Sequence, residues 1–560
     1  MEKGQIVELK IEDMTADGNG IGKVYADAGD LPFARLSDGQ GRQASDSNGQ
    51  RGFAVFVKGA VYGDTVRAEL TKVKKNYAFA KVTEVIEPSP YRQEPACEYS
   101  GICGGCAYSC LSYDAELALK EKQVREKLIR LGGIAEPVVR EIVGASDEPS
   151  PEDTVSEARS ERAAKARPQE APVRYRNKAS MPVSTGGLIT EKGGIVKPVH
   201  EPRIGFYRPK SHDVVDCDDC LLQSEPAMAA ARALRQFMEE DHITSYDPRW
   251  DKGLMRHMIV RTAAGTGEVM VILVINGKAI PNAQKLIEML DDAIYNVPVY
   301  EEGPLAGVEF NLESVVLNIN KSKKLEGQIL GEECITIAGK PTITEEVGGL
   351  KFEISPLSFY QVNREQMIRL YGKALEYASL KGDETVLDLY CGVGTIGLFA
   401  AAQMEGGRVI GIESVKGAVL DANRNATING IVNARYVCGK AEEELPRMVA
   451  NLAGGREDTD EKEQKYIQKY LEQDLHIEHA DVVILDPPRA GCETALLEAV
   501  TKTAPDRIVY VSCDPATLAR DIKWLGEHGY EFIEGTPFDM FPRTASVECV
   551  ALLTRKELEC

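Results

Sequence analysis

The sequence has no apolar run near the roughly 20 residues that a membrane-spanning helix needs, and its opening, MEKGQIVELKIEDM, has no signal-peptide core. It also lacks an excess of positive charge, since 66 Lys and Arg stand against 87 Asp and Glu for a net charge of −21. We therefore expect a cytoplasmic protein with no membrane contact, and one that is not a general nucleic-acid binder. In a reducing compartment its 13 cysteines are expected to be reduced, and the clustered ones to be metal ligands or nucleophiles rather than disulfides.

The stretch 173–211 departs from this acidic average, because basic and aromatic side chains are interleaved in it with only two glutamates. Its basic residues are Arg174, Arg176, Lys178, Lys192, Lys197, Arg203, Arg208 and Lys210, and its aromatic residues are Tyr175, Phe206 and Tyr207. A single-stranded nucleic acid needs phosphate neutralisation and ring stacking, which this pattern offers. A solvated basic face explains the same pattern equally well.

At 560 residues the chain is too long for one hydrophobic core, so we expect two to four domains. Residues 1–92 are expected to form a small all-β module, because short alternating runs are separated by glycine-rich turns. These runs are 5–11, 52–57, 65–73 and 78–86, with a polar insertion at about 25–51. The segments MTADGNGIGKV, GFAVFVKGAVYGDTVRAEL and KKNYAFAKVTEVIEPSPYR resemble a TRAM domain, a small RNA-binding β-barrel.

A cysteine cluster follows in CEYSGICGGC, where Cys97, Cys103 and Cys106 lie close together among glycines. This spacing indicates a metal or iron–sulfur site. Three ligands leave a fourth to be found, and the candidates are Cys217 and Cys220 in VVDCDDCLL. Zinc also binds four thiolates, so the spacing leaves the metal open.

A mixed α/β central domain is expected over 93–340, with a polar, proline-punctuated insertion at about 145–172. The runs 270–277 and 314–320 predict strands, and 282–294 predicts a helix. No catalytic constellation is visible in this part of the chain, so its expected role is to support the substrate.

From 341 to 560 strands and helices alternate, which predicts a doubly wound sheet with a charged insertion at about 454–475. The expected strands include 385–390, 408–413, 481–488 and 508–511. The end of the chain, YEFIEGTPFDMFPRTASVECVALLTRK, predicts two strands that close the sheet as an antiparallel hairpin.

A glycine loop in this last domain indicates a nucleotide-like ligand. Gly392-x-Gly394-x-x-Gly397 follows a strand, and Glu413 ends the next strand, where it can accept hydrogen bonds from ribose hydroxyls. A dinucleotide enzyme has the same two features. Asp388, just before the glycines, and DPPR at 486–489 favour a methyltransferase over a dehydrogenase.

The thiol of Cys513 ends the β-branched run IVYVSC, at the edge where open α/β sheets bind their ligands. A cysteine beside an apolar strand is more often a small buried hydrophobe, so this feature is weak alone. Five ordered motifs change that balance: FYQVNREQM, VLDLYCGVGTIGLFAA, DPPRAGC, VSCDPATLARD and FPRTASVECVALL. Together they resemble the RNA uracil-5-methyltransferase family, closest to the TRAM- and cluster-bearing bacterial 23S rRNA enzymes.

The resemblance implies a fold, a set of cofactors and a set of site residues. The fold is α/β: a C-terminal class I (Rossmann-like) methyltransferase sheet, an N-terminal TRAM β-barrel and a mixed α/β central domain. The implied cofactors are S-adenosylmethionine and a 4Fe–4S cluster. By resemblance, S-adenosylmethionine is bound by Gln361, Tyr390, Glu413 and Asp486, the nucleophile is Cys513, the general base is Glu548, and the cluster ligands are Cys97, Cys103, Cys106 and Cys220. The chain has Arg543-Thr544-Ala545-Ser546 where relatives often have a histidine.

These residue types suit the chemistry, because uracil C5 is too weak a nucleophile to attack a sulfonium methyl directly. Addition of a thiolate to C6 moves electron density onto C5, and a base then removes the C5 proton so that the thiolate can leave. The expected partner is RNA, with 23S rRNA favoured and tRNA possible, and the expected state is a monomer. The alternatives are a tRNA T-loop uracil-5-methyltransferase, an RNA cytosine-5-methyltransferase and a non-catalytic RNA-binding assembly factor.

Overall fold

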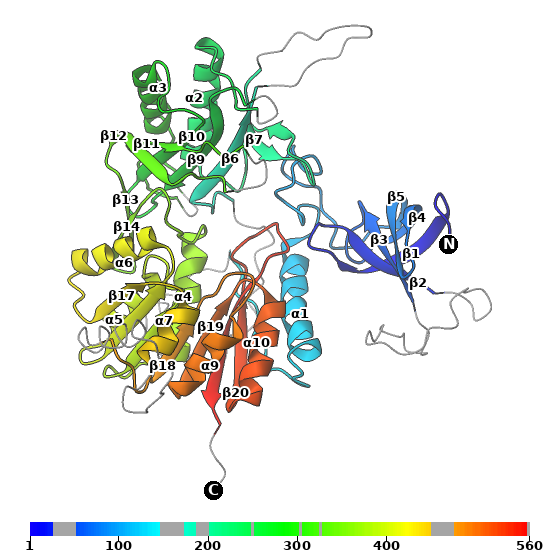
Figure 1. Cartoon of the computed structure of the whole chain (residues 1–560). Helices are drawn as coiled ribbons and strands as arrows, with labels where there is room; N and C mark the ends of the chain where they lie inside the picture. Colours follow the sequence, from blue (N-terminus) through cyan, green and yellow to red (C-terminus); the bar gives the residue numbers. More distant parts are fainter. Residues whose placement is uncertain are drawn as a thin grey trace.

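The computed structural model describes residues 1–25, 52–145, 173–185, 201–247, 251–301, 305–323, 328–449 and 475–556. The three predicted insertions fall almost entirely outside these residues, as do Lys192 and Lys197 of the basic stretch. Figure 1 shows a small blue barrel to one side, a green central layer of sheet and helices, and a yellow-to-red sheet covered by helices on both faces. None of the described helices is long and apolar enough to cross a membrane.

The N-terminal part is a closed five-stranded barrel in the order β1-β2-β3-β5-β4. Its strands are β1 (Ile6–Met14), β2 (Gly20–Val24), β3 (Phe53–Lys58), β4 (Thr65–Val73) and β5 (Tyr77–Glu87). Alternation places one side of each strand in the core, as with Val7, Leu9 and Ile11 of β1. Strand β2 is not among the expected runs because glycine has low strand propensity. A Cβ on Gly22 would lie 2.6 Å from Leu9 Cδ1, so the close packing of β1 and β2 requires glycine there.

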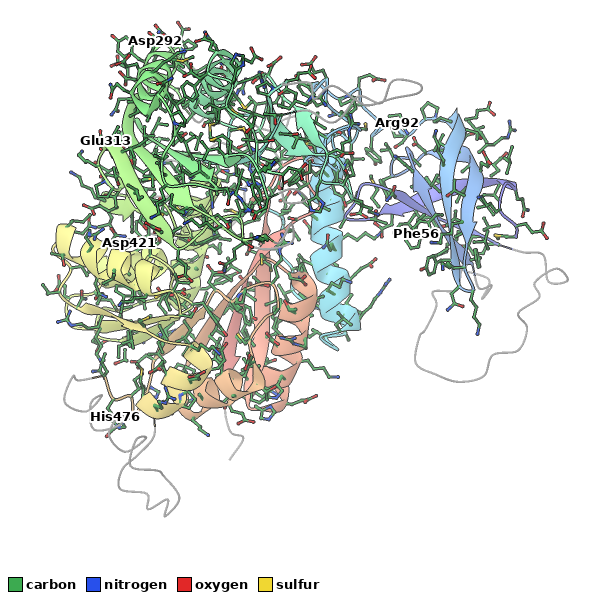
Figure 2. The ribbon with its side chains drawn as sticks, turned by 45° about the horizontal axis from the view of Figure 1, so that its top comes forward. Phe56, Arg92, Asp292, Glu313, Asp421 and His476 are labelled. Carbon is green, nitrogen blue, oxygen red and sulfur yellow. The ribbon has the colours of Figure 1, made fainter. Side chains whose placement is uncertain are left out.

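The barrel is joined to the rest of the chain through residues 93–112, which we call the cysteine segment, and then through helix α1 (Tyr113–Arg130). Arg92, labelled in Figure 2, forms an ion pair with the buried Asp64 where the chain leaves the barrel. Although α1 falls within the stretch expected to form the central domain, its buried face contributes Tyr113, Leu117 and Val124 to the core of the C-terminal sheet. The cysteine segment therefore stands between all three parts of the molecule.

The central part is a seven-stranded sheet in the order β12-β11-β10-β9-β6-β7-β8. Its strands are β6 (Lys178–Ser184), β7 (Arg203–Tyr207), β8 (Val214–Asp216), β9 (Met255–Thr262), β10 (Glu268–Ile275), β11 (Asn311–Ile319) and β12 (Glu333–Gly339). Helices α2 (Glu225–Glu240) and α3 (Ala283–Tyr295) pack on one face. The opposite face of β10 packs against the C-terminal core through Met270, Ile272 and Val274. The expected strands near 270 and 314 and the helix near 282 are present, with ends shifted by one to three residues.

The C-terminal sheet has the order β17-β16-β15-β18-β19-β21-β20. Its strands are β15 (Thr385–Leu389), β16 (Arg408–Glu413), β17 (Ala434–Cys438), β18 (Val482–Leu485), β19 (Arg507–Ser512), β20 (Tyr530–Phe538) and β21 (Glu548–Arg555). Its helices are α4 (Arg364–Ala378), α5 (Thr395–Ala402), α6 (Lys416–Ile428), α7 (Ala441–Met448), α9 (Thr494–Lys502) and α10 (Pro515–Glu527), and the hairpin of β13 (Ile343–Val347) and β14 (Leu350–Ile354) precedes them.

Five strands of this sheet are parallel, and β21 runs antiparallel between β19 and β20. The prediction of a doubly wound sheet closed by an antiparallel hairpin is therefore confirmed. Because β21 runs backwards, its first residue, Glu548, lies at the same edge of the sheet as the last residues of the parallel strands. This reversal brings the end of the chain to the ligand-binding edge.

Candidate active site

Five strand ends meet at the carboxyl edge of the C-terminal sheet. The chain leaves β15 toward the glycine loop and leaves β18 toward Asp486, and these two strands are neighbours at the point where the strand order reverses. Ligands of open α/β sheets bind at such a switch point. The backbone N–H of Asp486 donates to Leu389 O at 3.2 Å, which fixes the two loops side by side.

The glycine loop is held by Glu413. The N–H of Gly392 donates to Glu413 Oε2 at 3.1 Å, and the N–H of Val415 donates to Oε1 at 2.8 Å. Gly392 has φ +56°, and a Cβ built on it would meet no protein atom within 4 Å. The absent side chain leaves open space there, so a ligand can approach the backbone closely. The Ser414 hydroxyl also donates to Oε1 at 3.1 Å, so Oε2 is the oxygen that keeps a further lone pair with which it can accept a ribose hydroxyl.

A pocket with about 350 Å³ of empty space, part of it open to solvent, lies above this loop. It is lined by Phe359, Tyr360, Gln361, Tyr371, Asp388, Tyr390, Cys391, Gly392, Val393, Thr395, Ile396 and Asp486. Three of the four predicted donor-binding residues line it, and the fourth, Glu413, supports it through Gly392. Phe359 is 62% exposed, so an unusually open aromatic ring stands at this pocket.

Two buried polar atoms of this pocket have no hydrogen-bond partner in the described part of the chain. They are Asp388 Oδ1 and the Tyr360 hydroxyl. The other oxygen of Asp388 accepts the N–H of Gly397 at 2.9 Å. Burial raises the pKa of Asp388 to about 7, and burial together with Asp388 raises the pKa of Asp486 to about 7. Buried polar atoms without partners are costly, so this pocket is built to receive a polar, positively charged ligand.

Cys513 and Glu548 lie next to each other at the end of the β19–β21 pair. Ser512 is paired with Cys549, so the residues that follow and precede them are neighbours across the two strands. The thiol is partly exposed, whereas Glu548 is 4% exposed and its carboxyl group accepts no hydrogen bond from the described residues. Burial, Glu548 and Asp486 raise the pKa of Cys513 to about 11, and Arg489 opposes that shift. Burial and Asp486 hold the pKa of Glu548 well above its usual range.

Tyr390 has a different setting from the other pocket residues. It adopts φ +65°, and its hydroxyl donates to the Glu442 carboxylate of α7. Its ring packs against the second face of the sheet core. Both the pocket and the α7 contact therefore depend on the sharp turn at the end of β15.

The structure brings the candidate cluster cysteines together. Mutual charge interactions link Cys97, Cys103, Cys106 and Cys220, and Cys217 joins the same group. Burial raises the pKa of Cys106 to about 12, and all five thiols are free. No three of these sulfurs lie within 4.8 Å of one another. Among the described residues, the one group of three potential metal ligands that meets this distance is His479, Asp481 and Asp506.

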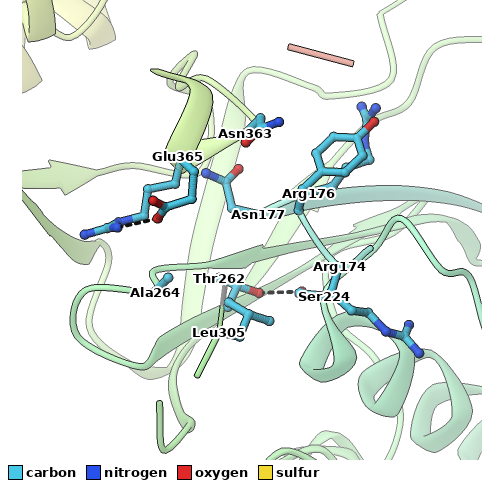
Figure 3. A pocket seen from close by; sticks show the side chains of 11 residues that line it. Arg174, Arg176, Asn177, Ser224, Thr262, Ala264, Leu305, Asn363 and Glu365 are labelled. Atoms are coloured by element: carbon cyan, nitrogen blue, oxygen red, sulfur yellow. Dashed lines mark hydrogen bonds and ion pairs between the residues drawn. The ribbon is translucent and has the colours of Figure 1, made fainter. Parts of the chain in front are cut away.

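The basic–aromatic stretch is only partly available to a ligand. Arg174 forms ion pairs with Asp219 and Glu225, and Tyr175 is 5% exposed. Figure 3 shows Arg174 and Arg176 beside a second pocket, of about 310 Å³, where the central sheet meets the start of α4.

Arg176 and Lys178 form no ion pair with a carboxylate in the described part of the chain. Burial, Arg261 and Arg176 lower the pKa of Lys178 to about 8. Among the described residues of the stretch, Arg176 and Lys178 are therefore adjacent cations without a neutralising carboxylate.

A second basic–aromatic surface lies on the barrel. Phe56, Tyr77 and Phe79 form an outward aromatic cluster with ring centroids 5.5–5.6 Å apart. The exposed side chains of Lys58, Lys72, Lys74, Lys75 and Lys81 come from the same strands β3 to β5 and their turn. We call this set the barrel face. Stacked rings beside ammonium groups suit a single-stranded nucleic acid.

Sequence reasoning did not assign roles to Arg489, Tyr360 and Tyr371. Arg489 acts electrostatically on both Cys513 and Glu548, and its place directly after Asp-Pro-Pro is the signal that could have identified it. Tyr360 lies between two motif residues, Phe359 and Gln361. Tyr371 is about two helical turns into α4 and carries no local signal, because only the fold turns it toward the pocket.

This edge, with a polar pocket beside a strand-end thiol and a buried carboxyl group, defines a methyltransferase-type site on a class I sheet. A family model described as tRNA (uracil-5-)-methyltransferase matches residues 336–556, and a TRAM domain model matches residues 1–83. The chain is 37% identical over 558 residues to an RNA methyltransferase of Halalkalibacterium halodurans, covering 99% of this chain and 98% of that protein. It is 36% identical to an RNA methyltransferase of Clostridium tetani, covering 99% and 97%.

Among solved structures, the chain is similar to the tRNA (uracil-54, C5)-methyltransferase of Pyrococcus abyssi in complex with S-adenosyl-L-homocysteine. The TM-score is 0.61 at 26% identity, covering 91% of this chain and 98% of that one. The chain belongs to the RNA (uracil-5-)-methyltransferase family, and its N-terminal barrel is a TRAM domain. It is an S-adenosylmethionine-dependent RNA methyltransferase of that family.

Proposed function

We propose that this protein methylates C5 of a uridine in 23S rRNA, with Cys513 as nucleophile and Glu548 as general base. The observation that carries the proposal is that these two residues lie side by side just beyond the Ser512–Cys549 pair of β19 and β21, at the edge that also holds the donor pocket. Thiol addition to C6 is needed for chemistry at uracil C5 and has no use in methylation of an amine.

The proposed reaction has two proton transfers, one when the covalent adduct forms and one when it breaks down. With its pKa near 11, the Cys513 thiol is protonated in the free protein, so its proton must go to the neighbouring Asp486 carboxylate as sulfur bonds to C6, which leaves Glu548 to accept the C5 proton. After C5 has taken the methyl group, Glu548 removes the C5 proton, the C5–H electron pair forms the C5–C6 double bond, and the C6–S bond breaks. The buried setting of Glu548 raises its proton affinity, which suits it to this removal.

S-adenosylmethionine supplies the methyl group when it is bound. Its fit to the pocket is supported by the unpartnered Asp388 Oδ1 and by the open space at Gly392. In this proposal Glu413 holds the ribose hydroxyls, Gln361 and Asp486 hold the polar end of the ligand, and the Tyr390 turn shapes the wall. The positive sulfonium would also relieve the repulsion among Asp388, Asp486 and Glu548.

We further propose that Cys97, Cys103, Cys106 and Cys220 hold a 4Fe–4S cluster. Support comes from the convergence of these four thiols in one part of the structure. Cys217 is a fifth thiol of the group, but it is 4% exposed and donates to Asp219 O at 3.3 Å, which favours Cys220 as the ligand. The methyl transfer needs no electron transfer, so the expected role is structural.

RNA is expected to lie across the barrel face and to pass Arg176 and Lys178 on its way to Cys513. The target base must leave its stack to reach the thiol, and the exposed ring of Phe359 offers a surface against which it can rest. The presence of both a cysteine cluster and a TRAM domain in this chain favours ribosomal RNA as the substrate. The similarity to the Pyrococcus abyssi enzyme favours the second candidate, a transfer RNA uridine.

The test is release of tritium from RNA labelled at uracil C5, with 23S rRNA and tRNA assayed separately and Cys513→Ala as control. We expect release from 23S rRNA that requires both S-adenosylmethionine and Cys513. Release from tRNA alone would replace the substrate and keep the reaction. Methyl incorporation without tritium release would contradict the uracil-5 assignment.

A further inference from the structure

The loop between β20 and β21 leads directly into Glu548 and is held almost entirely by distant parts of the chain. We define the base loop as residues 539–547. Figure 1 shows this red segment reaching up beside α1 toward the place where the barrel and the central layer meet. The position of Glu548 at the active edge depends on where this loop is held.

Arg543 is the most constrained residue of the base loop. It adopts φ +69°, a left-handed conformation that non-glycine residues occupy only when their surroundings impose it. Three hydrogen bonds impose it here, and all come from residues 108–116. The N–H of Tyr108 donates to Arg543 O at 3.0 Å, the N–H of Arg543 donates to Glu116 Oε1 at 2.7 Å, and its guanidinium donates to Leu111 O at 2.9 Å.

The start of the loop is anchored to helix α1 by a buried ionic network. Lys120 Nζ donates to Glu116 Oε1 and Asp539 Oδ1, both at 2.6 Å, and to Phe541 O at 3.2 Å. The Tyr113 hydroxyl donates to the other oxygen of Asp539 at 2.7 Å. The side chains of Glu116, Lys120 and Asp539 are fully buried, so the pairing leaves little freedom for the loop to shift as a whole.

Two other parts of the molecule contact the same loop. Tyr175, just before the central sheet, donates its hydroxyl to Pro542 O at 3.1 Å. Ala545 packs in a small apolar cluster with Val61 of the barrel and with Tyr108 and Leu111 of the cysteine segment. The base loop is therefore contacted by the barrel, the cysteine segment, α1 and the central part of the molecule.

We propose that the cysteine segment and α1 position the general base through Arg543, so that this part of the chain acts on proton removal from C5. This inference rests on the proposed function and deepens it. Arg543 is a positioning residue, because it contacts the loop's supports rather than the reacting atoms.

Proton removal is the last step, so its loss has a distinctive signature. If Glu548 is misplaced after C5 has been methylated, the C5–H bond stays intact, the C5–C6 double bond cannot form, and sulfur stays bonded to C6. The RNA then remains covalently attached to Cys513. A variant that only loosens the fold would instead slow methyl transfer and proton release together.

The experiment compares single turnovers of Arg543→Ala, Arg543→Lys, Tyr175→Phe and wild type, with RNA carrying tritium at uracil C5 and a labelled methyl donor. For Arg543→Ala we expect tritium release to slow about 10- to 100-fold, with methyl transfer changed less than about 3-fold. The RNA–protein adduct that survives denaturant should accumulate in proportion. Tyr175→Phe removes one hydrogen bond from the same loop and should show the same pattern more weakly, and Arg543→Lys should recover part of the rate.

The matched control is Arg555→Ala, which removes an exposed ion pair with Asp506 at the far end of the same strand. It should leave both rates unchanged. Equal slowing of methyl transfer and tritium release in Arg543→Ala, without adduct, would overturn the positioning role. Absence of tritium release from wild type would overturn the proposed function itself, so the two failures are distinguishable.

Discussion

The donor pocket and the base loop differ in how far along the chain their supports lie. The pocket is built from residues 359–413 and 486, which form a contiguous sheet, loop and helix plus one neighbouring strand end. The base loop is held by residues more than 400 positions away in sequence, such as Glu116 and Lys120. The difference teaches that the donor pocket is supported mainly within one domain, whereas the segment that leads into Glu548 is supported by distant parts of the chain.

The largest effect on methylation is expected at Cys513, at the edge of the sheet that holds both the donor pocket and Glu548. Cys513→Ser should reduce methylation by on the order of 10⁴-fold or more, because a serine hydroxyl is a far weaker nucleophile toward C6 at neutral pH. The affinity for S-adenosylmethionine should change little, since Cys513 does not line the donor pocket. Initial rates together with a donor-binding titration measure the two effects, and a parallel loss of donor affinity would show that the regions are not separable.

A change at the glycine loop should affect the donor pocket alone. Gly392→Ala places a methyl group in open pocket space and should weaken S-adenosylmethionine binding about 10- to 100-fold. Gly430→Ala is the matched control, because Gly430 also has positive φ (+66°) and no atom within 4 Å of its Cβ position, but it lies after α6, away from the pocket. Calorimetric titration checks this, and equal losses in both variants would point to backbone strain as the cause.

RNA binding should depend on the barrel face and leave the donor pocket untouched. Phe79→Ala should weaken RNA binding about 10-fold, as expected for loss of one stacked base. Ile6→Ala removes another exposed apolar side chain of the barrel, 61% exposed, and serves as the control. Filter binding at fixed salt measures the effect, and an unchanged Kd for Phe79→Ala would remove the barrel face from the proposed RNA path.

The smallest effect concerns stability of the ligand-free pocket. The pKa of Asp388 is raised from 3.8 to about 7, so the folded chain holds this proton more tightly than the unfolded chain, and stability falls as pH rises from about 4 to 7. Asp388→Asn removes this cost, so its Tm should exceed that of wild type by roughly 3 °C at pH 8 and by less at pH 5. Thermal melts at both pH values check the sign; a difference that does not depend on pH would contradict it.

The contrast between the local supports of the donor pocket and the distant supports of the base loop also explains which residues could be predicted from the sequence. The glycine loop, Glu413, Asp486 and Cys513 stand at strand ends, where local pattern predicts both strand and site, and the expected hairpin brought Glu548 to that edge. Tyr371 and the anchors of Arg543 could not be predicted, because they act through packing between segments with no sequence relation. Strand β2 was missed for a related reason: its glycines weaken the strand pattern and are required by contact with β1.

Local sequence patterns also do not predict the role of the insertions or which RNA is the substrate. The convergence of Cys220 with Cys97, Cys103 and Cys106 was expected from family resemblance, and the fold brings these thiols together. The spacing named both Cys217 and Cys220 as candidates for the fourth ligand and could not choose between them. Burial of Cys217 separates it from Cys220 in a way that spacing alone does not.

The most direct test of the central claim is covalent trapping with RNA in which the target uridine is replaced by 5-fluorouridine. Fluorine at C5 cannot be removed by a base, so the methylated adduct should be held on the protein after one turnover. We expect a denaturant-stable complex that forms only with S-adenosylmethionine, and peptide mass spectrometry should locate the nucleotide on Cys513. A complex linked to another cysteine, or methylation of the RNA without any trapped complex, would contradict the account.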